Sequence, residues 1–476
     1  MTKRLSLLPV LLLWSATVSA SGYEVRMNGT AQQVEPFKHY HYVSCTPDGA
    51  ADFTVTFPGP VASAEVSPLS RGIAPAVEGR TVRFRLPEAG HYLVRLNDTA
   101  KLFIFAEKPA QEVTGTSIMT YKGIDNTGTA NVTAAVQRAI DECAKKGRTL
   151  IFPAGEYLCG QLRLPSHAHL HLERGAVIRA DASSAAAFES TDNVKTRRFI
   201  YVKDAKGVRI TGLGAIDGNG RALREKFGDK ARTRLLLAVN SSDLHFEGVM
   251  FRDPGSWNTQ ILLCRDVVIR NIKLMNDTEL SNTDGFDPDA SRNLLIENCF
   301  GYCSDDNVAV KTTGYSGYLG DAENITVRGC VFLTKKSSLK VGTETRGTRM
   351  SKITFEDNDV LESDRGMALY VSDGTALSDV LYRNNRFERN HPDSKRMMFQ
   401  FSVNARRKDS PVGSIRGVEV RDCSFRVPFP KAPEIKCPAR GDIEGIVFEN
   451  LTVGGEKILA PEQLGLKCVN AEAVFK

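Results

Sequence analysis

The chain has 476 residues, enough for two or three average domains or for one long solenoid with a small domain. Its composition is ordinary for a globular protein, with 42% apolar residues, and its net charge of +6 is small for this length. A small charge without clustered basic runs argues against nucleic acid or a membrane surface as a partner. It neither supports nor excludes an acidic polysaccharide as a substrate.

Residues 1–20 have the pattern of a secretory signal peptide. Lys3 and Arg4 form its charged start, residues 5–14 its apolar core, and residues 18–20 offer small side chains for cleavage. The apolar core is too short to span a membrane. We therefore expect export to the periplasm or beyond.

Ten cysteines are spread over the chain, and none lies in a CxxC pair or a Cys/His cluster with the spacing of zinc ligands. We expect no metal site and no cofactor. Export permits disulfides, for example between Cys303 and Cys330 or between Cys423 and Cys437. Because Cys also fills a stacked apolar interior well, disulfides and free thiols both remain open.

Residues 21–108 have the pattern of a small all-β sandwich. Pro and Gly separate short runs of alternating residues, which indicates antiparallel strands. The runs cover residues 53–57, 82–86, 92–96 and 102–105. We expect a second domain over residues 109–476.

An amphipathic helix is predicted near residues 131–145. Its apolar residues recur at helical spacing, and Asn131 or Thr133 can cap its start. Lys145 and Gly147 suit its end. A single helix ahead of a β array fits a cap over the first coil, because an open end would expose unpaired strands.

From Leu150 onward, strand-like phrases repeat every 23 to 38 residues. Each has an apolar-x-apolar run, then Asn, Asp or Gly, then another apolar residue. Strand, sharp bend and strand is the coil of a parallel β-helix. We therefore predict an all-β fold, a right-handed parallel β-helix with a capping helix. One residue from each phrase marks the repeat: Ile210, Phe246, Ile269, Ile296, Val327, Phe355, Tyr382, Val420 and Phe448.

Three aspartates fall at the spacing of this repeat. Asp284 precedes the pair Asp305 and Asp306 by 21 residues (305 − 284). Stacked strands lie about 4.8 Å apart, so an offset near one repeat places Asp284 beside the pair. Clustered carboxylates repel, which raises the pKa of at least one of them. A protonated acid beside an ionised base is the equipment of glycoside hydrolysis, although Asp is also common in turns.

Around these residues the chain resembles glycoside hydrolase family 28, the polygalacturonases, over about residues 115–400. The resemblance implies that Asp305 is the general acid, that Asp284 and Asp306 activate water, and that hydrolysis inverts the anomeric centre. Inversion is associated with carboxyls about 6.5–9.5 Å apart. The matching segments are residues 133–140, 151–157, 212–218, Trp257, 282–285 and 304–311.

The chain departs from this family where the family binds a carboxylate. Ser337 stands at the family's His position, and Ala368 and Tyr370 replace its Arg and Lys. The loss of these cations argues against galacturonate at the cleavage point. The segment 21–108 is similar to the β-sandwich of family 49, whose members act on neutral α-glucans.

Further residues are candidates for substrate binding. Trp257 and Tyr370 fit sugar stacking, with a core position as the alternative for each. Lys340 and Arg365 fit replacements for the missing cations, or exposed charges. Asn282 and Lys311 lie within the matching motifs.

Nearby charged residues fit weaker roles. We expect Asp287 and Asp289 to be turn residues or to support the catalytic residues. Glu344 and Arg346 are less favoured than Lys340 and Arg365 as residues that replace the missing His, Arg and Lys in the cleft.

The sequence therefore predicts a secreted glycoside hydrolase that cleaves an α-linked polysaccharide or oligosaccharide with inversion, and not at unmodified galacturonate. The alternatives are a polygalacturonase or rhamnogalacturonan hydrolase acting on pectin, a uronan lyase or epimerase, and a non-catalytic glycan-binding β-helix. The expected partner is the saccharide, with no nucleic acid and no membrane; the oligomeric state is unknown at this stage.

Overall fold

The computed structural model describes residues 22–109 and 112–476, which divide into two compact units at Pro109–Ala110. The predicted signal peptide, residues 1–20, lies outside the described residues. No helix in the described part is long and apolar enough to cross a membrane.

The first unit is a sandwich of two five-stranded sheets. The four runs predicted from the sequence lie in its strands, except that residue 57 of the first run follows the end of its strand. The likeness to the sandwich of family 49 stays a prediction. In sheet order, the strands of the two sheets are β2 (Thr30–Gln32), β1 (Glu24–Met27), β5 (Ala51–Thr56), β8 (Thr81–Leu86) and β7 (Ala76–Glu78), then β3 (Glu35–Phe37), β4 (Tyr40–Cys45), β10 (Ala100–Ala106), β9 (Gly90–Leu96) and β6 (Ala64–Ser67).

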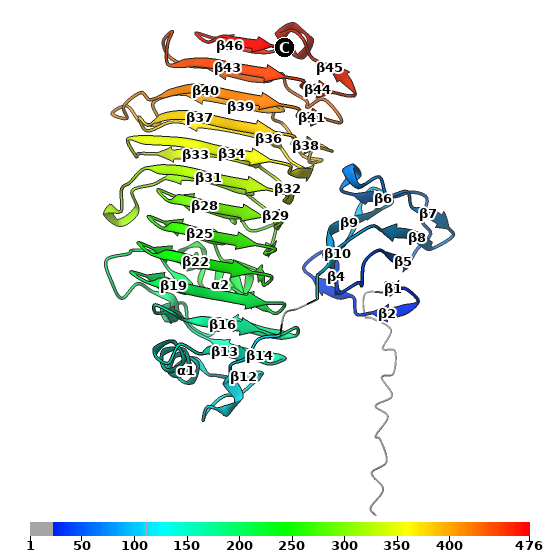
Figure 1. Cartoon of the computed structure of the whole chain (residues 1–476), viewed down its shortest axis with the longest axis vertical. Coiled ribbons are helices and arrows are strands. Elements are labelled where there is room, and N and C mark those ends of the chain that lie inside the picture. The colour runs from blue at the N-terminus through cyan, green and yellow to red at the C-terminus, as the bar shows by residue number, and fades with distance from the viewer. Residues whose placement is uncertain (1–21, 110–111) are drawn as a thin grey trace, which may run out of the picture. The chain divides into compact units, whose positions relative to one another are not determined.

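The second unit is the predicted right-handed parallel β-helix, in which three long sheets wind around one continuous apolar core (Figure 1). The first sheet has 13 strands. They are β11 (Thr116–Ser117), β13 (Thr149–Phe152), β16 (His169–Leu172), β19 (Lys206–Gly212), β22 (Ser242–Glu247), β25 (Arg265–Arg270), β28 (Arg292–Glu297), β31 (Ala322–Arg328), β34 (Arg349–Glu356), β37 (Ala376–Arg383), β40 (Ser414–Arg421), β43 (Ile443–Glu449) and β47 (Ala473–Phe475).

The second sheet also has 13 strands, of which the last, β45, pairs antiparallel. They are β12 (Thr127–Asn131), β14 (Gly155–Cys159), β17 (Ala176–Ala180), β20 (Ala215–Asp217), β23 (Met250–Arg252), β26 (Lys273–Met275), β29 (Phe300–Cys303), β32 (Val331–Thr334), β35 (Asp359–Glu362), β38 (Arg386–Phe387), β41 (Ser424–Phe425), β44 (Thr452–Val453) and β45 (Glu456–Lys457).

The third sheet has 11 strands and carries the candidate site. They are β15 (Leu162–Leu164), β18 (Arg198–Lys203), β21 (Arg234–Val239), β24 (Thr259–Leu262), β27 (Phe286–Asp289), β30 (Val308–Thr312), β33 (Ser337–Thr345), β36 (Arg365–Val371), β39 (Phe399–Val403), β42 (Glu434–Lys436) and β46 (Lys467–Val469).

The residues that marked the repeat in the sequence stack in register. Each pairs with the next along the first sheet, from Ile210 with Phe246 through to Val420 with Phe448. All are buried, so they form one column of the core. The predicted period is confirmed because every coil needs an inward apolar residue at this point.

An Asn, Asp or Gly residue after most of these strands makes the bend to the second sheet. After β25 it is Asn271, with φ of 52°, and after β34 it is Asp357, with φ of 55°. A left-handed backbone turns the chain sharply, and Asn, Asp and Gly adopt it at the lowest cost. This requirement explains the Asn/Asp/Gly signal between the apolar positions.

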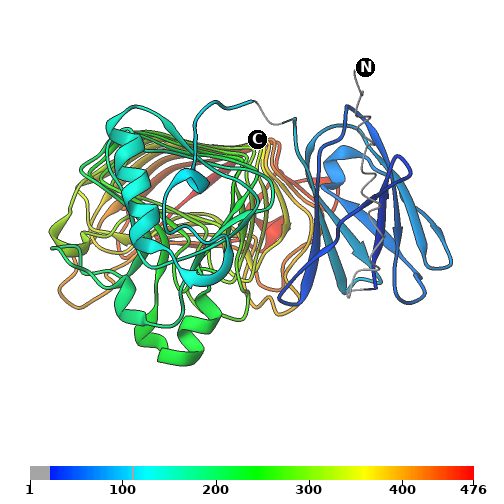
Figure 2. The same ribbon diagram turned by 90° about the horizontal axis from the view of Figure 1, so that it is seen from below.

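Helix α1 (Thr133–Lys145) lies across the first coil, as Figure 2 shows. Its buried face includes Val136 and Ile140, and Asn131 Oδ1 accepts the backbone N–H of Thr133 at 3.0 Å. The predicted capping helix is thus confirmed. A second helix, α2 (Gly220–Phe227), follows β20. All ten cysteines are free, and nine are buried in the described structure, so they act as core residues.

Candidate functional site

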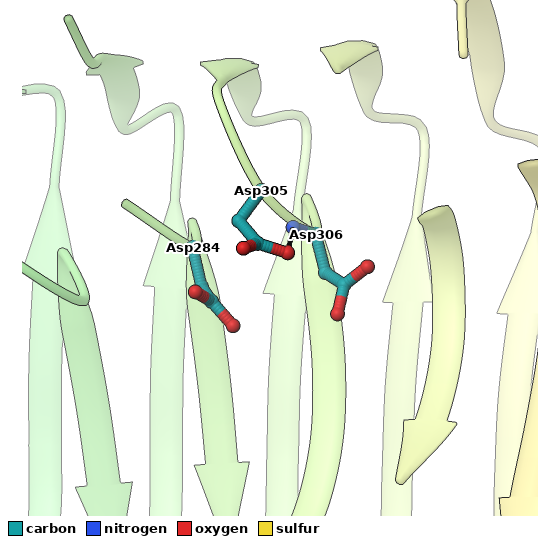
Figure 3. Close-up of side chains that lie close together, drawn as sticks. All are labelled: Asp284, Asp305 and Asp306. Carbon is teal, nitrogen blue, oxygen red and sulfur yellow. Dashed lines mark hydrogen bonds between the residues drawn. The ribbon is translucent and has the colours of Figure 1, made fainter. Parts of the chain in front are cut away.

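The catalytic candidates occupy equivalent positions on successive coils of the third sheet. Gly285 N–H donates to the carbonyl of Asp306 at 2.8 Å, and Asn258 N–H donates to the carbonyl of Asp284 at 2.9 Å. These ladder bonds place Asp284 and Asp306 side by side just ahead of β27 and β30. Asp305 precedes Asp306, and Figure 3 shows the three side chains together.

A glycine makes this close stacking possible. A Cβ on Gly285 would lie 2.4 Å from the carbonyl oxygen of Asn307, so no other residue fits there without moving the backbone. The Asn-Thr-Asp-Gly sequence therefore has a packing reason for its last residue, directly after Asp284.

The three carboxylates form a tight cluster. One oxygen from each of Asp284, Asp305 and Asp306 lies within 4.8 Å of the others. The sequence-based expectation of about 6.5–9.5 Å between carboxyls is therefore not what the oxygens show. The offset of one coil fixes the smaller distance, since neighbouring strands are only about 4.8 Å apart.

The environment of Asp305 favours its protonated form. Burial raises the pKa of Asp305 to about 7, with the charges of Asp284 and Asp306 adding to the effect. Lys340 and Lys311 oppose the shift without cancelling it. Asp305 is the one member of the cluster that is half-buried rather than buried, and the side chain borders an open cavity of about 640 Å³.

The environment of Asp306 favours the ionised form. Burial alone would raise its pKa, but the ammonium of Lys340, 2.6 Å away, acts together with Lys311 and the Ser337 N–H to leave the pKa below the ordinary value. The backbone N–H of Ser337 also donates to Asp306 at 3.0 Å. Lys340 is therefore a partner of the cluster rather than an exposed charge.

Asp284 shares a buried lysine with a second carboxylate. Lys311 Nζ lies 3.0 Å from Asp284 and 2.8 Å from Asp287, and all three side chains are buried. Burial raises the pKa of both carboxyls, while Lys311 opposes the rise. Asp284 Oδ1 has no hydrogen-bond partner among the described residues, which leaves one acceptor of the cluster unused.

Asp287 and Asp289 are not turn residues, contrary to one of the two roles expected from the sequence. Both lie in β27 and are fully buried. Asp289 accepts bonds from the Thr313 hydroxyl at 2.6 Å and from Gln260 at 2.7 Å. Through Lys311 and Gln260 they hold residues around the site in place, which is the other role expected for them.

Trp257 is in the site but is covered. Its exposed fraction is 8%, Lys311 Nζ lies 3.5 Å from its ring centroid, and the Arg234 guanidinium lies 4.5 Å away. Tyr315 contacts it at 5.7 Å between centroids. Because cations already lie over the ring, the structure gives Trp257 a role in holding them, and it does not offer the open face that sugar stacking needs.

The residues at the family's carboxylate-binding positions form a different group. Ala368 is fully buried and pairs with Lys340 in the neighbouring strand. Tyr370 remains half-buried, bonds to Gln400, and has Lys340 and Arg365 at 5.4 and 5.2 Å from its ring. Two cations thus lie near Tyr370, but neither replaces the missing side chains directly.

Arg365 and Asn282 are also held by protein groups. Arg365 donates to the Ser337 hydroxyl at 2.7 Å. Asn282 Oδ1 accepts from Arg232 at 2.9 Å, so its side chain faces an arginine. Substrate binding by either remains a prediction.

The two less favoured candidates, Glu344 and Arg346, differ in their contacts with the site. Glu344 lies 4.0 Å from Lys311 and 2.9 Å from Arg406, while Arg346 is exposed. Arg234, Gln260 and Arg406 could not be singled out from the sequence, because none lies in a motif. Arg234 and Gln260 do lie within phrases of the repeat, where polar residues on an outward face were the available signal.

A cation site is disfavoured at the carboxylate cluster. Its spacing would suit a metal ion. However, the ammonium groups of Lys340 and Lys311 already lie 2.6 and 3.0 Å from its oxygens. The two lysines balance the charge that a metal would otherwise neutralise. The absence of a metal site stays a prediction.

Comparison with known proteins identifies the class. The family model described as "Glycosyl hydrolases family 28" matches residues 143–391, just over half of the chain. The chain therefore belongs to glycosyl hydrolases family 28, a family of hydrolytic enzymes.

Individual relatives are more distant. A probable polygalacturonase of Vitis vinifera is 29% identical over 295 residues, which cover 56% of this chain and 59% of that protein. An endo-polygalacturonase of Pectobacterium carotovorum subsp. carotovorum is 25% identical over 296 residues, 54% of this chain and 70% of that one. The chain thus spans less than two thirds of the grape relative.

Solved structures share the fold. An exopolygalacturonase from Thermotoga maritima aligns with a TM-score of 0.60 at 18% identity, covering 78% of this chain and 92% of that one. A family 28 exopolygalacturonase from Yersinia enterocolitica aligns with a TM-score of 0.55 at 16% identity, covering 94% and 98%. At this identity the likeness supports the β-helix fold alone.

The buried lysine gives a stability prediction. Lys311→Met should destabilise the protein by about 3–5 kcal/mol, because the carboxylates of Asp284 and Asp287 stay buried without their cation. Urea unfolding followed by circular dichroism measures the change. Lys352→Met is the matched control, since its exposed pair with Glu323 is worth at most about 1 kcal/mol. Equal effects of the two changes would contradict the account of Lys311.

Proposed function

We propose that this protein hydrolyses an α-glycosidic bond of a pectic polysaccharide with inversion, using Asp305 as acid and Asp284 with Asp306 as base. The single observation that carries the proposal is one cluster of three carboxylates whose surroundings push two of their pKa values in opposite directions. Burial raises the pKa of Asp305 to about 7, while Lys340, Lys311 and the Ser337 N–H together hold that of Asp306 below its ordinary value. Groups whose pKa values are pushed apart in this way serve as acid and base.

The geometry suits a single attacking water. A water that makes two hydrogen bonds of about 2.8 Å reaches oxygens up to about 5.6 Å apart. The oxygens of Asp284 and Asp306 lie within 4.8 Å, so one water fits between them. In the proposed reaction Asp305 protonates the glycosidic oxygen as its bond to the anomeric carbon breaks. The water attacks that carbon from the opposite face and passes its proton to the carboxylate pair.

The charges that line the cavity beside Asp305 favour an anionic polymer as the substrate. Its lining carries five cationic side chains against three carboxylates besides Asp305, which are Glu279, Asp364 and Asp393. Basic side chains at this density favour uronate groups over neutral sugars. The cations are Lys335, Lys336, Lys395, Arg396 and Lys431.

At the cleavage point, in contrast, the surrounding residues do not favour an anionic sugar. Ala368 provides no cation, and Lys340 is engaged by Asp306. An unpaired carboxylate in a buried site costs several kcal/mol, so an unmodified galacturonate fits poorly there. We therefore propose a pectic substrate whose sugar at this point is neutral or esterified.

Unmodified homogalacturonan is the second candidate, and one observation favours it. Arg365 and Lys340 both lie within 5.4 Å of the Tyr370 ring, close to where the family's two cations are expected. If Arg365 leaves Ser337 to bind a uronate, the missing cations are replaced.

A substrate panel distinguishes these candidates. We expect kcat/KM on rhamnogalacturonan to exceed that on unmodified homogalacturonan at least tenfold, with no cleavage of dextran or pullulan. Proton NMR of the first product, before mutarotation, should show inverted configuration. A retained product, or an unsaturated sugar that absorbs in the ultraviolet, would rule out the mechanism. Efficient homogalacturonan cleavage that Arg365→Met abolishes would favour the second candidate.

The roles of the three aspartates are testable one by one. Asp284→Asn, Asp305→Asn and Asp306→Asn should each lower kcat by about 10²–10⁴ or more, since each removes a positioned acid or base. Asp266→Asn, on the exposed surface of the first sheet, should leave kcat unchanged. Thermal unfolding verifies that the variants are folded. Near-full activity of Asp305→Asn would refute its assignment as the acid.

The pH profile tests the charge of Lys340. Activity needs protonated Asp305 and should therefore fall as pH rises through about 7. It also needs ionised Asp306, so it falls at low pH. Lys340 lowers the pKa of both groups, and Lys340→Met should move both limbs of the kcat/KM profile to higher pH. Lys122→Met, at an exposed site remote from the cluster, is the control; unmoved limbs in Lys340→Met would contradict the account.

A further inference from the structure

The outer face of the third sheet changes character beside the catalytic coil. On β18, β21 and β24 several outward residues are apolar and buried, and they form a cluster separate from the helix interior. Leu237 of β21 pairs with Gln260 of β24, which pairs with Asp287 of β27, so this column turns polar from β24 onward. The cluster consists of Val194, Tyr201, Leu237, Val239 and Leu262, none more than 1% exposed.

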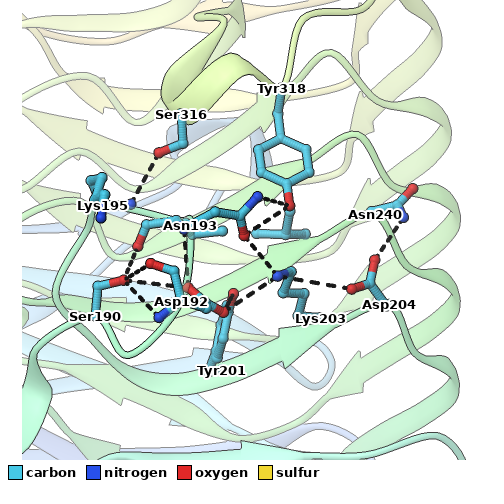
Figure 4. Close-up of polar contacts among 12 residues, drawn as sticks. Ser190, Asp192, Asn193, Lys195, Tyr201, Lys203, Asp204, Asn240, Ser316 and Tyr318 are labelled. Atoms are coloured by element: carbon cyan, nitrogen blue, oxygen red, sulfur yellow. Dashed lines mark hydrogen bonds and ion pairs between the residues drawn. The ribbon is translucent and has the colours of Figure 1, made fainter.

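Two loops form a roof over this apolar face. One, residues 189–197, precedes β18, and the other, residues 313–319, follows β30. Val194 from the first is part of the cluster and Tyr318 from the second packs on it. Lys195 N–H donates to Ser316 Oγ at 3.0 Å, and Asn193 donates to the Tyr318 hydroxyl at 3.2 Å (Figure 4).

The roof crosses the sheet rather than following one edge. The first loop enters the start of β18, whereas the second leaves the end of β30, and three strands lie between these two in the sheet order. In a parallel sheet, strand starts and strand ends lie on opposite edges. Contact between the loops therefore closes the outer face from edge to edge.

The first loop is fixed in place. The Tyr201 hydroxyl donates to Asp192 at 2.8 Å, and the buried guanidinium of Arg198 lies 3.1 Å from the same carboxylate. Lys203 donates to Asn193 at 2.9 Å. These bonds tie the roof to β18, so it is a built part of the fold.

A short cavity of about 460 Å³ lies between the roof and the aspartates, and its lining includes Lys195 and Tyr315 from the two loops together with Arg232 and Arg234. Arg234 lies 4.5 Å from the ring centroid of Trp257 and 4.9 Å from that of Tyr315, which belongs to the second loop. Lys311 then connects Trp257 to Asp284. On this side, little more than one coil separates the catalytic carboxylates from the wall.

The cavity on the other side of the cluster is larger. The cavity of about 640 Å³ begins at Asp305 and runs past Lys336 and Asp364 to Lys431. The proposed acid protonates the leaving group, so the leaving part of the substrate lies on the side that Asp305 borders. The retained sugar lies in the short cavity that the roof bounds.

From this asymmetry we propose that the enzyme cleaves single sugars from the non-reducing end of its polymer, with the closed end of the cleft formed by residues 189–197 and 313–319. The remaining polymer extends from the cleavage point into the basic cavity. This inference rests on the proposed function and on the assignment of Asp305, and it adds the mode of action.

Hexasaccharides of rhamnogalacturonan and homogalacturonan, labelled at the reducing end, test the proposal. At early times the label should appear only in the fragment one sugar shorter, with unlabelled monosaccharide released in equal amount. Labelled di- or trisaccharides as first products would overturn the inference while leaving the hydrolase function intact. Absence of any cleavage across the polysaccharide panel would overturn the proposed function and this inference together.

A variant that removes contacts of the roof provides a second test of the proposal. The double variant Val194→Gly with Tyr318→Ala should release mid-chain fragments that the unaltered enzyme does not. Leu319→Ala is the matched control, since Leu319 lies in the same loop but is 57% exposed. A folded double variant that still releases only monosaccharide would contradict the role of the roof. If the double variant does not fold, the product pattern of the unaltered enzyme decides.

Discussion

The site depends on the regular stacking of one coil on the next. In a parallel β-helix each residue lies about 4.8 Å from its counterpart on the neighbouring coil, and hydrogen bonds fix the register. Asp284 and Asp306 are such counterparts, joined through the ladder bond from Gly285. A slip of one residue would turn one of the two carboxylates into the core, so the fold and the chemistry share one constraint.

Stacking also brings like charges close together at the site. It brings four acidic side chains together where water is scarce, and mutual repulsion would destabilise the fold if all were ionised. Lys311 and Lys340 each neutralise part of this charge from a neighbouring strand. Both lysines also oppose the rise in the pKa of Asp305, but burial and the charges of Asp284 and Asp306 still raise it to about 7. The proposed acid therefore owes its raised pKa chiefly to burial, as do Asp284 and Asp287.

Much of the fold and the centre of the site could be predicted because they follow the repeat. Column residues such as Ile269 and Phe355 recur at each coil, and Asp284 lies one coil before Asp306. The supporting contacts could not be predicted in this way. Lys195 and Ser316 touch across 121 residues of sequence, and such a contact between loops leaves no periodic signal. Trp257 was misleading for a related reason, because Arg234 and Lys311 cover its ring only in three dimensions.

The central claim is that one cluster holds an acid and an ionised base at the same pH. Carbon-13 NMR titration of aspartate side chains, assigned by the three Asp→Asn variants, measures this directly and without substrate. Because the groups interact, the values belong to the cluster as a whole. The account predicts one step with an apparent pKa of about 7, lost in Asp305→Asn, and one carboxyl with a pKa below the ordinary value of aspartate, lost in Asp306→Asn. Three carboxyls that all titrate in the ordinary range of aspartate would contradict it.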